Sequence, residues 1–237
     1  MGGMTVAGTI QRNLYRHLGP FDVFVFVSTR GGAREPAAGD VTSCEPLRPA
    51  GELGAHFECV VEAEAELPVF RDSAIWATFH YKSSPTLHQS LLQQLYGLHR
   101  CHAMVRRHAR RSGVSYSHVM RVRPDMAFLW PFPGLARLDF GPPWAPVVRV
   151  VDRRNCCCGN EDTFGVGRAE AMHVYMDRYL ALQTMAHEWC NGSGWTAESF
   201  VADLLHKTLN ASIAGHPAIA GCIVRPADRQ ELGPGTP

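Results

Sequence analysis

The sequence lacks long apolar runs, an excess of either charge and any regular spacing of its cysteines. Because no run of about 18 apolar residues occurs, we expect no membrane-spanning helix in this chain. Its 23 basic and 22 acidic residues leave a formal net charge of +1, which gives no support for bulk binding to nucleic acid or to a membrane surface. The first residues lack a basic segment followed by an apolar one, so they do not predict a signal peptide.

The eight cysteines include no C-x-x-C pair, so a zinc ribbon or a thioredoxin-like redox site is poorly supported. Cys101, Cys190 and Cys222 are isolated in the sequence, and we expect them to be small packing residues. Only residues 156–158, in the stretch "NCCCGNED", form a cluster. For these three cysteines a disulfide, a metal contact and an incidental loop are all open interpretations.

The sequence does contain an alternation of apolar, strand-like runs with amphipathic helices. Strands are predicted at residues 21–28, 57–64, from 117, 147–151, 163–167 and 221–226, and helices at 7–18, 86–111, 169–187 and from about 196. This alternation indicates an α/β sandwich of three layers with a mainly parallel central sheet, in which ligands bind outside the carboxyl ends of the strands. We expect one domain over residues 1–230 and a disordered tail over 231–237.

The strongest predicted helix, residues 86–111, repeats leucine at helical spacing and lies between Pro85 and Gly113. Its later half carries five arginines: Arg100, Arg106, Arg107, Arg110 and Arg111. They form either a phosphate-binding patch or a solvated face that complements the C-terminal end of the helix dipole. Binding of RNA or another polyanion is a third hypothesis, but the near-zero net charge and the lack of an aromatic platform count against it.

The helix at 169–187 presents an apolar stripe that is typical of core packing, formed by Met172, Met176, Tyr179 and Leu180. The histidines show no H-E-x-x-H or comparable metal-binding spacing. We therefore expect five of them to be ordinary surface residues or residues with satisfied hydrogen bonds: His80, His88, His99, His102 and His108.

Three charged residues, Arg121, Arg123 and Asp125, follow one another in the stretch "RVRPD" at the end of an apolar strand. Because strand side chains alternate, the three share a face with Val119, and we expect the charges to emerge at the carboxyl end. Pro124 cannot donate a ladder hydrogen bond, so regular pairing should stop there. Arginine presents a planar fork to phosphate oxygens, and aspartate can hold a hard divalent cation. An Arg–Asp ion pair that ties a loop to the strand end is the alternative.

Residues 91–128, "LLQQLYGLHRCHAMVRRHARRSGVSYSHVMRVRPDMAF", resemble the central segment of a group of GT-A-like glycosyltransferases. Gln94, Tyr96 and Cys101 stand at the helix positions of that segment, and "RVRPD" matches its R-x-R-x-D strand end. The resemblance implies an enzyme that transfers a sugar from a nucleotide-diphospho-sugar to an unknown glycan, protein or lipid acceptor.

The resemblance also assigns roles to the charged stretch. It implies that Arg121 and Arg123 bind the diphosphate and that Asp125 holds Mn²⁺ or Mg²⁺. Arg123 stands where the first acid of the family's D-x-D motif lies, so either one carboxylate suffices, with phosphates and water completing the metal shell, or the arginines replace the metal. The chain begins at about the helix that follows the family's first strand, and we expect that strand to be lacking.

Two further acids are candidate catalytic residues by the same resemblance. "EDTFGVGRAEAM" resembles the family's D-x-F-x-x-G strand and the helix after it, which implies that Asp162 contacts the sugar or acts as a general base. "TAESFVADLLH" resembles a late helix that begins near an acidic residue, here Glu198. The alternatives are that Asp162 satisfies backbone amides in a loop and that Glu198 complements the helix dipole.

The absent first strand and the single acid favour a second hypothesis, a catalytically inactive glycosyltransferase-like domain that binds a glycan or a protein. Two N-glycosylation sequons, at Asn191 and Asn210, permit a location in the secretory pathway. We expect the Golgi or secretory lumen if an N-terminal anchor precedes this sequence, and the cytoplasm otherwise.

Overall fold

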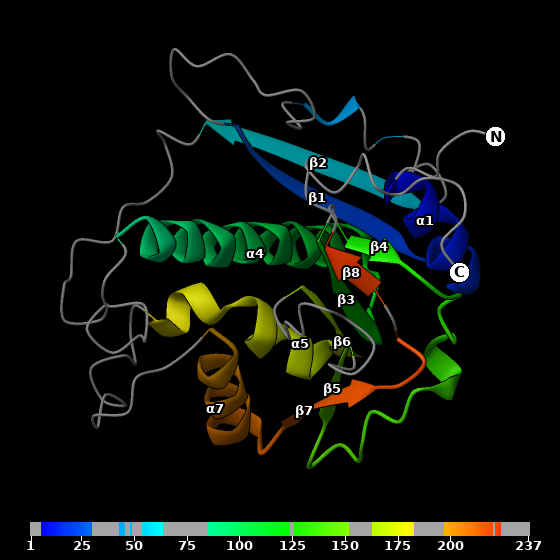
Figure 1. Cartoon of the computed structure of the whole chain (residues 1–237), viewed down its shortest axis with the longest axis vertical. Helices are drawn as coiled ribbons and strands as arrows, with labels where there is room; N and C mark the ends of the chain where they lie inside the picture. Colours follow the sequence, from blue (N-terminus) through cyan, green and yellow to red (C-terminus); the bar gives the residue numbers. More distant parts are fainter. Residues whose placement is uncertain are drawn as a thin grey trace.

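The computed structural model describes residues 6–29, 43–45, 48, 54–63, 85–123, 126–151, 163–182, 197–219 and 221–223. The chain is an α/β protein in which helices pack against a small parallel sheet and a mixed sheet (Figure 1). The elements are α1 (Val6–Asn13), η1 (Tyr15–His17), β1 (Asp22–Thr29), β2 (His56–Ala63), α4 (Pro85–Ser112), β3 (His118–Val122), β4 (Met126–Phe128), η4 (Leu135–Arg137), β5 (Val147–Val151), β6 (Phe164–Arg168), α5 (Ala169–Met176), α7 (Ala197–Leu209), β7 (Ser212–His216) and β8 (Gly221–Ile223).

The small sheet consists of β1 and β2, which pair in parallel from Asp22 opposite His56 to Thr29 opposite Ala63. Both strands are predicted by the sequence, and both are confirmed. The long helix α4 lies along this sheet on one side and along α5 on the other (Figure 1). A Cβ atom at Gly97 would come within 3.1 Å of the Phe26 ring, so this glycine lets the helix approach β1 closely.

The larger sheet has the strand order β3–β6–β5–β7. β6 is antiparallel to both of its neighbours, whereas β5 and β7 are parallel. The expectation of an α/β fold is confirmed, but a mainly parallel central sheet is not. β4 and β8 form a separate antiparallel pair, and β7 has no counterpart among the strands predicted from the sequence.

Each face of the larger sheet builds its own apolar cluster because successive strand side chains point to opposite faces. In β5, Val148 and Val150 belong to the cluster that α4, α5 and α7 cover. Val151 and, in β6, Phe164 belong to the cluster on the other face, which also contains Leu14, the residue directly after α1. Both faces of this sheet are therefore interior, which determines where the side chains of β3 can go.

The helical segment after β6 is interrupted at Asp177, where α5 ends in a turn. Met172, Met176 and Tyr179 are buried as predicted, but Leu180 is 39% exposed. The prediction of this apolar stripe assumed one unbroken helix. The Leu180 amide instead bonds three residues back to the Asp177 carbonyl (2.9 Å), which shifts the helical register, and Leu182 takes the buried position.

Candidate functional site

Arg121, the first of the charged residues predicted to form a site, lies in β3 opposite Gly165 of β6. Its exposed fraction is 5%, so the expectation that the whole charged face emerges toward solvent is wrong for this residue. The alternation itself is right, because Val119 and Arg121 are the buried residues of β3. The error has a simple cause: the face that they share is covered by helices.

The guanidinium of Arg121 lies close enough to α4 for its charge to act on Cys101. Desolvation raises the pKa of the Cys101 thiol to about 12, although a hydrogen bond from the Phe26 backbone and the Arg121 charge both act to lower it. Arg121 is therefore near the place where α4 and β1 meet β3. Cys101, a free thiol packed against the apolar cluster, behaves as the small packing residue that the sequence predicts.

The Nη1 atom of Arg121 is buried and has no hydrogen-bond partner among the residues that the structure describes. The N–H groups of a guanidinium are obligatory donors, and a buried donor without an acceptor carries a desolvation cost. An oxyanion that reaches Nη1 would remove that cost. This atom is the clearest unmet requirement for a ligand near the predicted site.

Arg123 directly follows Val122, the last residue of β3, and is half-buried. Its amide donates to the Thr163 carbonyl (3.1 Å), which extends the pairing of β3 with the strand β6 by one residue. The amide of Met126 donates in turn to the Arg123 carbonyl (3.1 Å). The structure thus brings the end of the "RVRPD" strand beside the residue that directly follows Asp162 in the sequence.

The three predicted acids fall outside this description. Asp125 and Asp162 lie outside the described residues, and for Glu198 only the backbone is described, in the first turn of α7. In the described part of the chain, no group of three or more His, Cys, Asp or Glu side chains could hold a metal ion. The assignment of Asp125 to a metal stays a prediction.

A second group of polar residues, not predicted as a unit, joins α4 to α5 around the carboxylate of Asp177. His99 Nδ1 lies 2.9 Å from Oδ1, His102 Nδ1 lies 3.0 Å from Oδ2, and Arg106 Nη1 lies 3.1 Å from Oδ2. On its other side, His102 Nε2 lies 2.6 Å from Nδ1 of His173. We call these five residues the Asp177 cluster.

The charges of the Asp177 cluster influence one another. Burial raises the pKa of the Asp177 carboxyl, but its contacts with His102 and His99 and the charge of Arg106 outweigh it, and the net pKa lies below the ordinary value. The pKa of His173 is also lowered, first by burial and then by the charges of His102 and Arg106. Asp177 is therefore held as a carboxylate and His173 as a neutral ring.

The spacing in the sequence contained a signal for this cluster. His99, His102 and Arg106 recur at helical spacing on one face of α4, and Asp177 lies four residues after His173. The sequence did not show that this face of α4 meets the residues His173 and Asp177. The expectation of satisfied histidines holds for His99, whose Nδ1 bonds to Asp177. His102 has an exposed fraction of 0% and is not a surface residue, and its Nδ1 has no hydrogen-bond partner among the described residues.

A third polar group lies on the other side of α4, against β1 and β2. The rings of His56 and His108 stack at 3.9 Å, and His108 Nε2 lies 3.6 Å from Oδ2 of Asp22. The hydroxyl of Tyr116 donates to the same Asp22 oxygen. The pKa of the Tyr116 hydroxyl is raised, first by burial and then by the hydrogen bond with Asp22. We call these four residues the Asp22 cluster.

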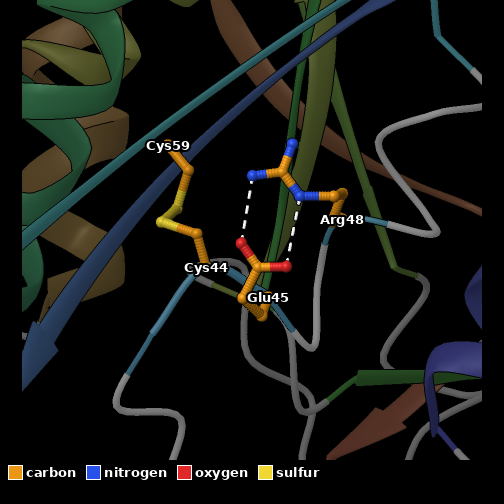
Figure 2. Close-up of a disulfide and its surroundings, with 4 residues drawn as sticks. All are labelled: Cys44, Glu45, Arg48 and Cys59. Carbon is orange, nitrogen blue, oxygen red and sulfur yellow. Dashed lines mark hydrogen bonds and ion pairs between the residues drawn. A yellow bond between two sulfur atoms is a disulfide. The ribbon is translucent and has the colours of Figure 1, made fainter.

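A disulfide between Cys44 and Cys59 attaches the segment around Cys44 to β2 (Figure 2). Beside it, Arg48 donates two hydrogen bonds to the carboxylate of Glu45, at 3.1 and 3.3 Å. This pairing could not be predicted from the sequence, because the spacing of two isolated cysteines does not determine a connectivity. The cysteines at 156–158 lie outside the described residues.

Comparison with family models, with curated proteins and with solved structures gives no match for this chain. Within the described residues, no helix combines the length and the apolar character that crossing a bilayer requires.

Proposed function

We propose that the chain is a GT-A-like glycosyltransferase that transfers a sugar from a nucleotide-diphospho-sugar to a glycan, protein or lipid acceptor. The observation that carries the proposal is the buried Arg121, whose Nη1 has no partner among the described residues. A diphosphate oxygen is a strong acceptor for a guanidinium, and the pair would satisfy the buried charge. Arg123, two residues on and half-buried, supplies a second cation at the strand end.

The remaining roles in the proposal come from the sequence resemblance. Asp125 would hold Mn²⁺ or Mg²⁺ against the diphosphate, and the ion would stabilise the charge that develops on the leaving nucleoside diphosphate. Asp162 would contact the sugar or accept the proton of the acceptor hydroxyl. Glu198 would lie near the sugar at the start of α7. The three-layer GT-A arrangement belongs to the same proposal.

The disulfide between Cys44 and Cys59 supports a location for this activity. Disulfides persist in oxidising compartments and are rare in the cytosol. The sequons at Asn191 and Asn210 agree with such a compartment. We therefore place the protein in the secretory lumen within this proposal.

A thermal-shift panel of nucleoside diphosphates, with and without Mn²⁺, tests the proposal. We expect at least one nucleotide with Mn²⁺ to raise the melting temperature, and Asp125→Asn and Arg123→Gln to abolish the rise. Arg111→Gln is a matched control, since it removes the same charge from an exposed position on α4. A response that survives Asp125→Asn would remove Asp125 from the metal role.

The inactive alternative predicts a different result. No nucleotide would then raise the melting temperature, and no sugar would be transferred, whereas a glycan array would still give binding. That combination would overturn the enzyme assignment and leave a glycan-binding domain.

A further inference from the structure

A hollow of about 330 Å³ lies where the end of α4, the segment before β3 and the start of α5 come together. Arg106 and Arg110 of α4, Ser115, Tyr116 and His173 are among the residues that line it. Ser115 and Tyr116 precede β3, whereas Arg121 and Arg123 lie at its far end. The hollow is therefore separate from the site proposed for the nucleotide-sugar.

The cations that line the hollow are not all neutralised by the protein. Arg106 pairs with Asp177 (3.1 Å), and two other arginines of α4, Arg100 and Arg107, pair with Glu62 and Glu58 of β2. Arg110 is exposed, and no carboxylate within the described part of the chain lies within ion-pair distance of it. Arg110 is thus the cation in the hollow that no described carboxylate neutralises, whereas Arg106 shares its charge between Asp177 and the hollow.

His173 adds a group that can either accept or donate a hydrogen bond. Nδ1 of His102 lies 3.0 Å from a carboxylate oxygen of Asp177, although it makes no hydrogen bond within the described residues. On its other side, His102 Nε2 lies 2.6 Å from Nδ1 of His173, and one of these two nitrogens donates to the other. This contact occupies Nδ1 of His173 and leaves its Nε2 as the nitrogen that faces a ligand. No hydrogen-bond partner for that nitrogen is found within the described residues.

A second depression, of about 300 Å³, borders the other side of the same histidine. It is lined mainly by apolar residues, including Leu180 of the interrupted helix and Leu204 of α7, and it contains no arginine. The arginines therefore distinguish the first hollow as the one suited to an anion.

We propose that the first hollow binds the phosphate group of a small phosphorylated molecule, with Arg110 and Arg106 as its cationic partners and protonated His173 as a hydrogen-bond donor. Two guanidinium groups offer planar forks to a tetrahedral oxyanion, and Ser115 contributes a further polar residue. The volume is at the small end of the range of ligand pockets, about 300–1,000 Å³, which suits a phosphate with a short organic remainder.

Binding at this site is coupled to a proton. In the free protein, burial and then the charges of His102 and Arg106 lower the pKa of His173, while Asp177 and Glu170 act in the opposite direction. A bound dianion favours the protonated ring, so it raises this pKa again. Affinity should therefore increase as the pH falls from 7.5 to 6.

Sulfate is the first probe, because it stays a dianion over this pH range and any pH dependence then comes from the protein. The full chain is titrated with sodium sulfate at constant ionic strength, and amide resonances of α4 and α5 are followed by NMR. We expect saturable shifts and tighter binding at pH 6 than at pH 7.5. Glycerol 3-phosphate should bind more tightly than sulfate at pH 7.5, because its organic part occupies the rest of the hollow.

Matched variants distinguish specific binding in the hollow from a general attraction of the anion to the positive charge of α4. Arg110→Gln should weaken sulfate binding about tenfold, the effect of losing one charge-assisted hydrogen bond. Arg111→Gln removes the same charge from the neighbouring residue, which does not line the hollow, and should change affinity less than about twofold. His173→Gln should retain binding at pH 7.5 and lose the increase at pH 6.

Three results would overturn the proposal. The first is that Arg110→Gln and Arg111→Gln weaken sulfate binding equally. The second is that the pH dependence of binding survives His173→Gln, and the third is that glycerol 3-phosphate binds no more tightly than sulfate. Folding of each variant is checked by its amide spectrum. These results are independent of the nucleotide response, which depends on Arg123 and Asp125.

Discussion

On its two sides α4 contacts β1 and α5, and each contact contains an aspartate surrounded by histidines. Toward α5, three side-chain nitrogens, from His99, His102 and Arg106, lie within 3.1 Å of the one carboxylate of Asp177. Toward β1, Asp22 accepts from Tyr116 and lies 3.6 Å from a single histidine nitrogen. The same residue types therefore build a concentrated network on one side and a dispersed one on the other.

The dispersed side continues along β2, whose face toward α4 is charged. Glu58 and Glu62 lie on the same strand face and pair with Arg107 and Arg100 of the helix. Both arginine side chains are more than 40% exposed, so water competes for these pairs. The comparison indicates that the α5 side concentrates its polar contacts on one carboxylate, whereas the β1–β2 side disperses them and depends more on apolar contact and on its disulfide.

The largest expected effect is the removal of the central carboxylate on the α5 side. Asp177→Ala removes the carboxylate that three side-chain nitrogens share, and we expect the free energy of unfolding to fall by about 4 kcal/mol, because contacts with a charged group contribute about 1.5–3 kcal/mol each and this carboxylate is only 20% exposed. Asp22→Ala on the other side, where the carboxylate has fewer donors, should cost about 2 kcal/mol. Urea unfolding followed by circular dichroism measures both values. Equal losses would contradict the contrast between the two sides.

The next effect concerns the disulfide on the β1–β2 side. The variant with both Cys44→Ser and Cys59→Ser should lose about 3 kcal/mol, the loop-closure contribution of a bridge of this length, whose cysteines are 15 residues apart. Hydrogen exchange should accelerate first in β1 and β2 and only later in α5. Cys101→Ala is the control, because its thiol is free, and reductant should not affect the double variant. Uniform acceleration over both sides of α4 would show that they unfold as one unit.

The sequence predicted the elements on both sides of α4 because their signals are local. Apolar spacing was enough to identify α4 and β1, and Gly113 with its φ of 72° ends the helix as expected. What the sequence did not show were contacts between distant residues. His102 meets His173 across 71 positions, and Tyr116 meets Asp22 across 94. Spacing along one element does not determine which element it faces.

The candidate site illustrates the same limit in one residue. Alternation along the strand placed Arg121 correctly on the face of Val119. It could not show that helices cover this face, because burial depends on elements distant in the sequence. The burial makes the residue more informative than an exposed arginine, since a covered cation requires an acceptor.

A smaller effect is the dependence of stability on pH, to which His173 on the α5 side contributes. His173 has a folded pKa below its ordinary value of 6.5, so the unfolded chain takes up a proton there before the folded one does. Its contribution to stability is complete above pH 6.5 and is lost as the pH falls through the folded pKa. His118, whose pKa is lowered by burial and then by Arg168, acts in the same window. Asp177 adds a further loss only below its ordinary value of 3.8.

We therefore expect wild-type stability to decline between pH 7.5 and 5.5, and His173→Gln to make the decline shallower. The double variant with His118→Gln should give the flattest profile. Chemical denaturation at four pH values in this interval measures the slopes. An unchanged slope in His173→Gln would show that burial of this ring does not influence stability.

The smallest effect on stability, and the sharpest comparison, comes from two adjacent arginines that α4 directs to opposite sides. Arg107 pairs with Glu58 on the β2 side and Arg106 with Asp177 on the α5 side. Because both side chains are at least 40% exposed, each change to glutamine should cost less than about 1 kcal/mol.

The effects of these two changes on His173 should differ. The charge of Arg106 helps to lower the pKa of His173, so Arg106→Gln should raise that pKa and Arg107→Gln should leave it unchanged. An NMR titration of the His173 ring protons measures this directly. An equal rise in both variants would mean that the ring responds to the total charge of α4, and the two sides of the helix would then not be electrostatically separate.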